Sequence, residues 1–305
     1  MQETDNHTSK TVVFDDWNEF FDEVIYRKGT FYDRINNGFI YRGDSGEFDL
    51  LPKSLRPTEF ENILKLSTKY FTFDETQLNL INIEKSILVN FFYNCDDNSL
   101  YIPKIERLKL YFQKLKNTKG ISNTYDKVWI PKYMFELAGL AQHYGLPTRL
   151  LDWSRDFNTA LYFASTGEPN GEYIVIWALN LLHFWNVKEN TPKCDRTSEL
   201  IFIDPEYYRN PNLGSQKGIL SLWQIDVKED YYQKIDRTPL DQLIETRYKD
   251  DDDLDEPLLY KFMIPNTYVN NIYAHLRKNG YSAGRLFPGY EGVVKTIIED
   301  KKFDF

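Results

Sequence analysis

Cysteine is scarce in this sequence, and its scarcity excludes two classes of protein. Only Cys95 and Cys194 occur among 305 residues, far apart and without a neighbouring Cys or His that would complete a set of metal ligands. A structural zinc site needs about four such ligands, and a disulfide-stabilised small domain needs several cysteine pairs. We therefore expect no metal ion and a protein that works in a reducing compartment.

Long apolar runs are absent as well. No segment approaches the roughly 18–20 consecutive apolar residues that cross a bilayer. The first thirteen residues, MQETDNHTSKTVV, are polar and contain no apolar stretch of the kind that secretory signals carry. These two features predict a cytoplasmic protein that does not insert into a membrane.

The sequence also has no excess of positive charge. Lys and Arg total 37 against 46 Asp and Glu, which gives a net charge of −9. Proteins that coat DNA without sequence preference need clustered cations, so this balance argues against that class, although it is compatible with a local basic groove. Hydrophobic residues at 42% and aromatic residues at 16% indicate a globular protein whose core is built largely from rings.

Hydrophobic periodicity predicts one α+β domain over residues 13–305, preceded by a flexible leader at residues 1–12. The N-terminal half is α-rich: a helix opens at residues 15–17, with Asp in the capping position, and a helical insertion occupies about 58–120. Because strands and helices then mix without strict alternation, we expect a single β-sheet flanked by helices.

The second half of the chain changes from helical to strand-like patterns. Segments rich in β-branched and aromatic residues predict strands at residues 172–179, 218–223 and 258–264. A helix is expected from Thr267 to Lys278, where Asn-Gly follows. Residues 249–256, KDDDDLDE, predict an acidic surface loop, because runs of like charge are usually solvated.

Tyr41-Arg42-Gly43 is the first segment whose residues could bind a ligand or take part in a reaction. It lies at the end of a predicted short strand over residues 39–41. The planar guanidinium of Arg42 offers a fork of donors that suits a phosphate or a carboxylate. Gly43 would let a backbone or a ligand approach closely. The alternative is that Arg42 makes an ordinary surface ion pair.

Residues 142–154, QHYGLPTRLLDWS, form the second such segment, which we expect between two helices, with Asp152 or Ser154 capping the second. His143 has three open roles: a general base, an anchor for a ribose hydroxyl, or a structural histidine. Arg149 and Asp152 either belong to a site or simply pair with each other. The segment places many polar side chains beside the sharp turn at its Gly-Leu-Pro sequence, and this density favours a functional site.

These segments resemble the FRG domain, a family named for its Phe/Tyr-Arg-Gly motif. The similar segments follow one another from about residue 17 to 297: residues 41–43, 51–56, 142–154, 160–164, 216–218 and 286–292. Asn212 and Leu220 depart from the family pattern. The resemblance implies a bacterial protein with a toxin or phage-defence role. It also implies an antitoxin or a phage protein as a possible trigger.

A more distant resemblance is to mono-ADP-ribosyltransferases of the Arg-Ser-Glu type, which also begin with a strand ending in Tyr-Arg-Gly. It implies NAD as substrate, with Arg42 on a phosphate and Thr148 or Ser154 in place of an absent Ser-Thr-Ser element. Glu291 and Gln216 are the candidates for the acidic position, and neither lies in a Glu-x-Glu motif. The macromolecular acceptor, protein or nucleic acid, stays open.

The residues expected at the site follow from both resemblances and from the two polar segments. The catalytic candidates are Arg42, His143 and Glu291. The candidates for NAD binding are Tyr41, Arg42, Gly43, Tyr144, Thr148, Arg149, Asp152 and Gln216.

Two other functions fit the same residues. A metal-independent nuclease would use His143 as base, with Arg42 and Arg149 on phosphate. A non-catalytic recognition module for a nucleotide, a nucleic acid or a protein would use both segments as a binding pocket, or as a polar network that stabilises the fold.

Overall fold

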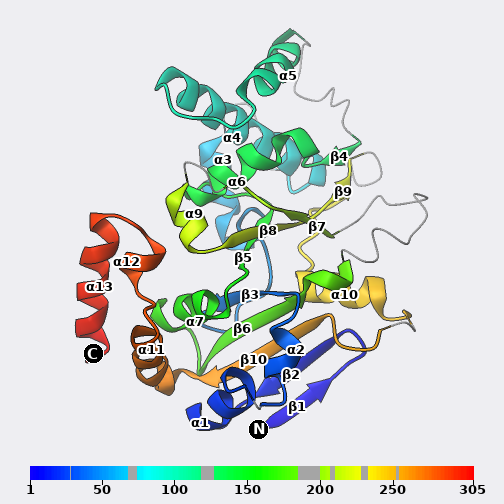
Figure 1. Cartoon of the computed structure of the whole chain (residues 1–305). Helices are drawn as coiled ribbons and strands as arrows, with labels where there is room; N and C mark the ends of the chain where they lie inside the picture. Colours follow the sequence, from blue (N-terminus) through cyan, green and yellow to red (C-terminus); the bar gives the residue numbers. More distant parts are fainter. Residues whose placement is uncertain are drawn as a thin grey trace.

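Eight strands of the described chain form one mixed sheet in the order β1-β2-β10-β6-β3-β5-β8-β7 (Figure 1). The computed structural model describes residues 1–27, 29–67, 74–117, 127–184, 200–206, 210–227, 233–251 and 254–305. Cys194, residues 252–253 of the predicted acidic loop, and residues 68–73 and 118–120 of the predicted insertion lie outside these ranges.

The strands of this sheet come from both ends and the middle of the chain. Their bounds are β1 Gln2–Asp5, β2 Ser9–Val13, β3 Phe39–Asp44, β5 Leu150–Ser154, β6 Tyr173–Asn180, β7 Leu200–Ile203, β8 Gly218–Trp223 and β10 Leu259–Pro265. Two short strands, β4 (Val128–Trp129) and β9 (Ile225–Asp226), pair separately. The β2–β10 pairing is parallel, and the other pairings in the large sheet are antiparallel.

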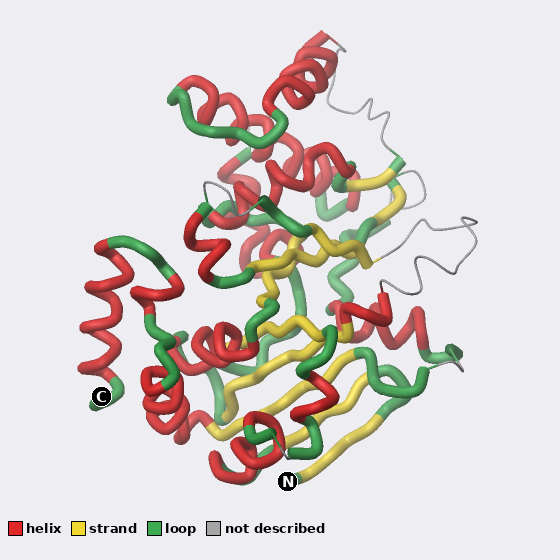
Figure 2. The backbone as a smooth tube through the Cα atoms, viewed as in Figure 1, coloured by secondary structure: helices red, strands yellow, loops and turns green. Residues whose placement is uncertain are grey.

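Helices surround the sheet unevenly. Their bounds are α1 Trp17–Phe20, which continues as a π-helix over Phe21–Ile25, α2 Tyr32–Ile35, α3 Phe60–Leu66, α4 Gln77–Asp97, α5 Ile105–Asn117, α6 Phe135–His143, α7 Phe157–Thr166, α9 Pro211–Ser215, α10 Leu240–Tyr248, α11 Val269–Lys278, α12 Ala283–Leu286 and α13 Tyr290–Lys302. Figure 2 shows α3–α6 gathered at the end of the molecule that holds β7 and β8, away from β1 and β2.

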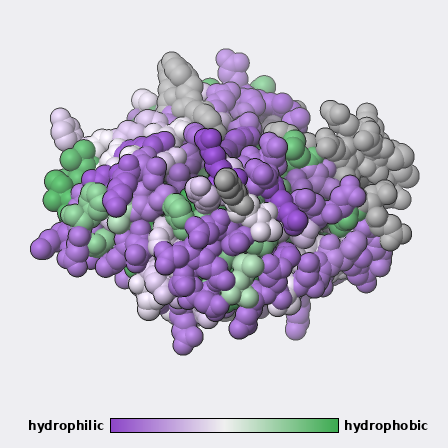
Figure 3. All heavy atoms as spheres, turned by 60° about the horizontal axis from the view of Figure 1, so that its bottom comes forward, coloured by the Kyte–Doolittle hydropathy of each residue, from purple (hydrophilic) through white to green (hydrophobic). Residues whose placement is uncertain are grey.

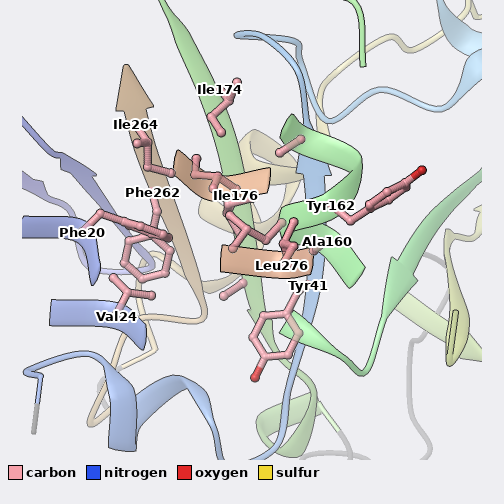
Figure 4. Close-up of a cluster of buried hydrophobic side chains, with 14 of the residues drawn as sticks. Phe20, Val24, Tyr41, Ala160, Tyr162, Ile174, Ile176, Phe262, Ile264 and Leu276 are labelled. Carbon is pink, nitrogen blue, oxygen red and sulfur yellow. The ribbon is translucent and has the colours of Figure 1, made fainter. Parts of the chain in front are cut away.

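The core lies on both faces of the central strands. On one face, β6 and β10 pack against α1, α7 and α11, and rings such as Phe20, Tyr41 and Phe262 fill the space between them (Figure 4). On the other face, Ile40 and Trp177 pack with α10 residues. Adjacent residues of β3 therefore point to opposite layers, as the alternation of a strand requires.

The expected fold class is confirmed: a large mixed sheet is flanked by helices, and the helices α3–α6 make the N-terminal half α-rich. The predicted strands at 172–179, 218–223 and 258–264 correspond to β6, β8 and β10. Asp16 caps α1 by accepting hydrogen bonds from the backbone N–H groups of Asn18 and Glu19.

Two expectations are wrong. Residues 1–12 are not a leader, because β1 and β2 are part of the sheet and Val12 is fully buried in its core. Neither Asp152 nor Ser154 caps a helix, because both lie in strand β5, and the N-cap of α7 is Asp156. The segment 142–154 thus joins a helix to a strand.

Candidate functional site

A cavity of about 440 Å³ opens where β3 and β5 separate. The two strands pair at a single position, Tyr41 with Ser154, and beyond it their backbones diverge. The widened gap is closed by side chains of α6, α7, β8 and the segment after α12. Among the residues that line it are Tyr41, Arg42, Gly43, Asp44, Gln142, His143, Asp152, Ser154, Thr159, Gln216 and Phe287.

Arg42 bridges the two separating strands. Its Nε and Nη2 donate to the carboxylate oxygens of Asp44 at 3.0 and 2.9 Å, and its Nη1 donates to the backbone oxygen of Asp152 at 3.1 Å. Burial alone would lower the pKa of Arg42, but the negative charges of Asp44 and Asp152 outweigh burial and raise it. Arg42 is therefore a fixed cation in the cavity wall, 17% exposed.

Arg56 lies close to the same ion pair and was not among the predicted site residues. Burial lowers its pKa, and the positive charge of Arg42 lowers it further, while Asp44 acts in the opposite direction. Its Nε donates to the backbone oxygen of Leu51 at 3.0 Å. Arg56 therefore feels the charges of Arg42 and Asp44, but it is not among the residues that line the cavity.

Gly43 is required by packing between β3 and α7. A Cβ atom at this position would lie 1.8 Å from the backbone oxygen of Ala160, far inside van der Waals contact. Gly43 therefore permits a close approach, as the sequence predicts, and the group that approaches is the backbone of α7. Tyr41, on the same face of β3, donates its hydroxyl to the backbone oxygen of Ile35 at 2.5 Å.

His143 and Asp152 contribute the titratable groups on the opposite wall. His143 ends α6, and burial lowers the pKa of its imidazole, although the nearby Asp152 carboxylate partly offsets the effect. The imidazole is therefore neutral near pH 7 and can accept a proton. Asp152 lies in β5 with its side chain exposed to the cavity. Tyr144 is 68% exposed, packs its ring edge-on against His143, and is not among the lining residues.

Gln216 makes two hydrogen bonds that connect separate elements on the far side of the cavity. Its Nε2 donates to the backbone oxygen of Leu286 at 3.1 Å, and its own backbone oxygen accepts from the Ser154 hydroxyl at 2.7 Å. Ser154 also accepts from the backbone N–H of Asp156, the cap of α7. This chain of bonds joins β5, α7 and α12 around the cavity.

A comparison with protein families matches part of the chain that forms the cavity. Residues 37–172 match the FRG domain. The matched region contains Arg42, Gly43, His143 and Asp152, and it ends before Gln216. No curated protein and no solved structure matches the chain.

Two predicted ligand-binding residues of the FRG region have structural roles. Arg149 is almost fully buried and donates its Nε to Glu84 at 2.7 Å, and the indole of Trp129 donates to the same carboxylate oxygen at 2.6 Å. The alternative pairing of Arg149 with Asp152 is therefore not observed. Thr148 is buried and donates its hydroxyl to Gln142, so it orients a side chain that lines the cavity.

Glu291 lies outside the FRG region and away from the cavity. It is exposed in the first turn of α13 and is not among the lining residues. The structure therefore does not bring Glu291 together with Arg42 and His143.

Thr159 of α7, within the FRG region, also lines the cavity, although no sequence pattern points to it. It is 1% exposed, and its hydroxyl has no hydrogen-bond partner among the described residues. A buried hydroxyl without a partner costs free energy, which a ligand in the cavity would recover by bonding to it. A threonine in an amphipathic helix carries no sequence signal of this role.

Two further features concern metal binding and membrane insertion. Within the described residues, no group of three or more His, Cys, Asp or Glu side chains is arranged to hold a metal ion. Across the same residues, every helix is too short or too polar to cross a bilayer.

Proposed function

We propose that the cavity binds NAD or a similar dinucleotide and that the protein cleaves the bond between nicotinamide and ribose. The observation that carries this proposal is that Arg42, His143, Asp152 and Gln216, which come from three segments far apart in the sequence, line one cavity. Its volume falls in the range of about 300–1,000 Å³ that small-molecule sites occupy.

The charges around the cavity support a ligand that carries both signs. Arg42 supplies positive charge for a pyrophosphate. Asp44 and Asp152 engage three of the about five donors of its guanidinium, which leaves the others for a ligand. Asp152 supplies a carboxylate to the same space. The nicotinamide ring of NAD is cationic and its pyrophosphate is anionic, so one molecule can satisfy both.

The proposed chemistry assigns the acidic role to Asp152 in place of Glu291. The bond from the ribose C1′ to the nicotinamide nitrogen breaks, and its electron pair leaves with neutral nicotinamide. The ribose becomes oxocarbenium-like, and the Asp152 carboxylate stabilises this positive charge. Neutral His143 takes the proton of the attacking water or acceptor group as the new bond to C1′ forms.

We also propose a cellular role, which the match to the FRG domain does not itself test. In a bacterial cell, such chemistry would serve a toxin or a phage-defence protein that modifies a protein or nucleic-acid acceptor. A binding partner, either an antitoxin or a phage protein, would control it.

Release of nicotinamide from NAD by the purified protein, alone and with cell lysate as a source of acceptor, tests the proposal. We expect release by the wild type, loss of release in Asp152→Asn, and retention in Glu291→Gln. Loss in Glu291→Gln with retention in Asp152→Asn would reverse the assignment. Absence of release with and without lysate, and of any NAD-dependent rise in melting temperature, would refute it.

Phosphodiester cleavage is the second candidate, favoured by one observation. Burial keeps His143 neutral, and within the described residues its imidazole has no hydrogen-bond partner, so it is available as a base. Arg149 cannot take part, because it is buried against Glu84. RNA cleavage that is lost in His143→Ala, with no release of nicotinamide, would favour this candidate.

A further inference from the structure

Helix α13 packs against the rest of the protein through its small and polar residues. Gly292 is buried, and a Cβ at its position would lie 2.0 Å from the backbone oxygen of Phe287. Thr296 accepts from the backbone N–H of Gly284 at 2.8 Å. Glu299 is 5% exposed and accepts from the Tyr162 hydroxyl at 2.7 Å. The inward face of α13 is therefore polar.

The outward face of α13 carries the apolar side chains. They are between 53% and 93% exposed and are Tyr290, Val293, Val294, Ile297 and Ile298. Their spacing of i, i+3, i+4, i+7 and i+8 puts them in one stripe along the helix. Figure 1 shows α13 at the margin of the molecule, and green residues lie at the same margin in Figure 3.

This stripe differs from ordinary surface composition. Single exposed apolar residues are common, but five that share one helix face form a continuous patch, and such patches mark interaction sites. No described element covers the stripe. Because α13 turns its polar face inward and its apolar face outward, we infer that the apolar face is an interaction surface.

We propose that the stripe pairs with the same stripe of a second copy of this chain, with the two α13 helices antiparallel. The stripe is self-complementary. When a two-fold axis passes midway between Val294 and Ile297, Val294 of one copy lies opposite Ile297 of the other. Val293 likewise lies opposite Ile298. A two-fold axis at this point produces a closed dimer.

The charges of α13 select this arrangement. Glu291 lies in the first turn and Lys302 in the last, and both flank the same edge of the stripe. Antiparallel pairing brings Glu291 of one copy beside Lys302 of the other, at both ends of the interface. It also opposes the two helix dipoles. Parallel pairing would instead place like charges together.

A lipid surface fits the stripe less well. Helices that lie on membranes usually carry Lys and Arg along their polar face and bind anionic lipid. The polar face of α13 is occupied by contacts with α7 and α12, and the chain has a net charge of −9. Vesicle binding is therefore an outcome that would contradict the dimer.

The dimer is tested by analytical ultracentrifugation of the full chain over a range of concentrations up to about 100 µM. We expect a species of twice 36.3 kDa. Ile297→Glu should weaken the association by about tenfold or more, because it buries a charge in the stripe. Leu110→Glu, at a site on α5 that is 62% exposed, is the matched control and should leave the dimer unchanged.

A charge exchange tests the antiparallel register itself. Glu291→Lys alone and Lys302→Glu alone should each weaken the dimer, because like charges meet at both ends. The double variant should restore it. Three results would overturn the proposal. The wild type could be monomeric at the highest concentration, or Ile297→Glu could leave the dimer unchanged. The double variant could also associate more weakly than both single variants. Binding to anionic vesicles that is lost in Ile297→Glu would overturn it as well. The proposal is independent of the proposed activity.

Discussion

The Arg42 guanidinium donates a hydrogen bond to the backbone oxygen of Asp152, across 110 positions of sequence and 3.1 Å of space. The bond spans the point where β3 and β5 separate, so it joins the Tyr-Arg-Gly strand to the segment that carries His143. Two motifs that are remote in the sequence thereby become the two walls of one cavity.

Replacing Arg42 by Lys tests the planar fork directly. The ammonium keeps the positive charge but cannot make the two parallel bonds to Asp44 or present the remaining donors to a phosphate. We expect NAD to bind about tenfold more weakly. Calorimetric titration measures the change, and affinity equal to that of the wild type would remove Arg42 from the phosphate site.

Thr159→Val separates ligand binding from stability. The substitution keeps the shape and removes a buried hydroxyl that has no partner in the described structure, so we expect the free energy of unfolding to stay the same or rise by about 1 kcal/mol. NAD affinity should fall by about three- to tenfold, since one hydrogen bond is lost. Urea unfolding and titration with NAD provide the two measurements. Lower stability with unchanged affinity would show that Thr159 has a partner within the protein.

Gly43→Ala distinguishes packing from ligand approach. Its Cβ would overlap the backbone oxygen of Ala160, so β3 and α7 must move apart. We expect the free energy of unfolding to fall by about 1–3 kcal/mol or more, measured in urea. A variant of normal stability that has lost NAD binding would mean that a ligand, and not α7, requires glycine here.

Arg149→Ala tests the buried ion pair. It would leave the almost fully buried Glu84 carboxylate without its cation, and we expect a loss of about 3–5 kcal/mol in unfolding free energy. The double variant Arg149→Met, Glu84→Gln removes both charges and should recover part of this loss. Equal stability of the single variant and the wild type would show that the pair contributes nothing.

The pKa of His143 predicts how stability depends on pH. Burial lowers this pKa below its ordinary value of 6.5, so at slightly acidic pH the unfolded state binds more protons than the folded state. The free energy of unfolding should therefore decrease as the pH falls through about 6.5, and the decrease should be smaller in His143→Gln. Unfolding in urea at about pH 7.5 and about pH 5.5 checks this. An identical decrease in both proteins would contradict it.

Local sequence patterns predicted the elements that carry the site, but not every neighbour of each residue. The strand that carries Arg42 and the helix that ends at His143 follow from periodicity and turn residues. Strands β1 and β2 pair with each other, but the residues of both are largely polar and show no strand pattern. Strand β2 joins the large sheet by pairing with β10, far along the chain. Pairing between distant segments leaves no local pattern.

The roles of individual side chains depended on the same distant contacts. Arg149 lies beside the site residues in the sequence, yet its partner Glu84 is 65 positions away and turns it from the cavity into the core. Glu291 is separated from the cavity by the orientation of α13. Thr159 lines the cavity only because α7 faces the gap between β3 and β5.

Calorimetric titration of NAD into the wild type and two variants tests the central claim most directly. If Arg42 and Thr159 line one dinucleotide site, the wild type binds NAD saturably with one molecule per chain, and both Arg42→Lys and Thr159→Val weaken that binding. Tyr144→Ala, outside the cavity, leaves it unchanged. The absence of saturable binding by the wild type, or binding that both cavity variants retain in full, would contradict the account.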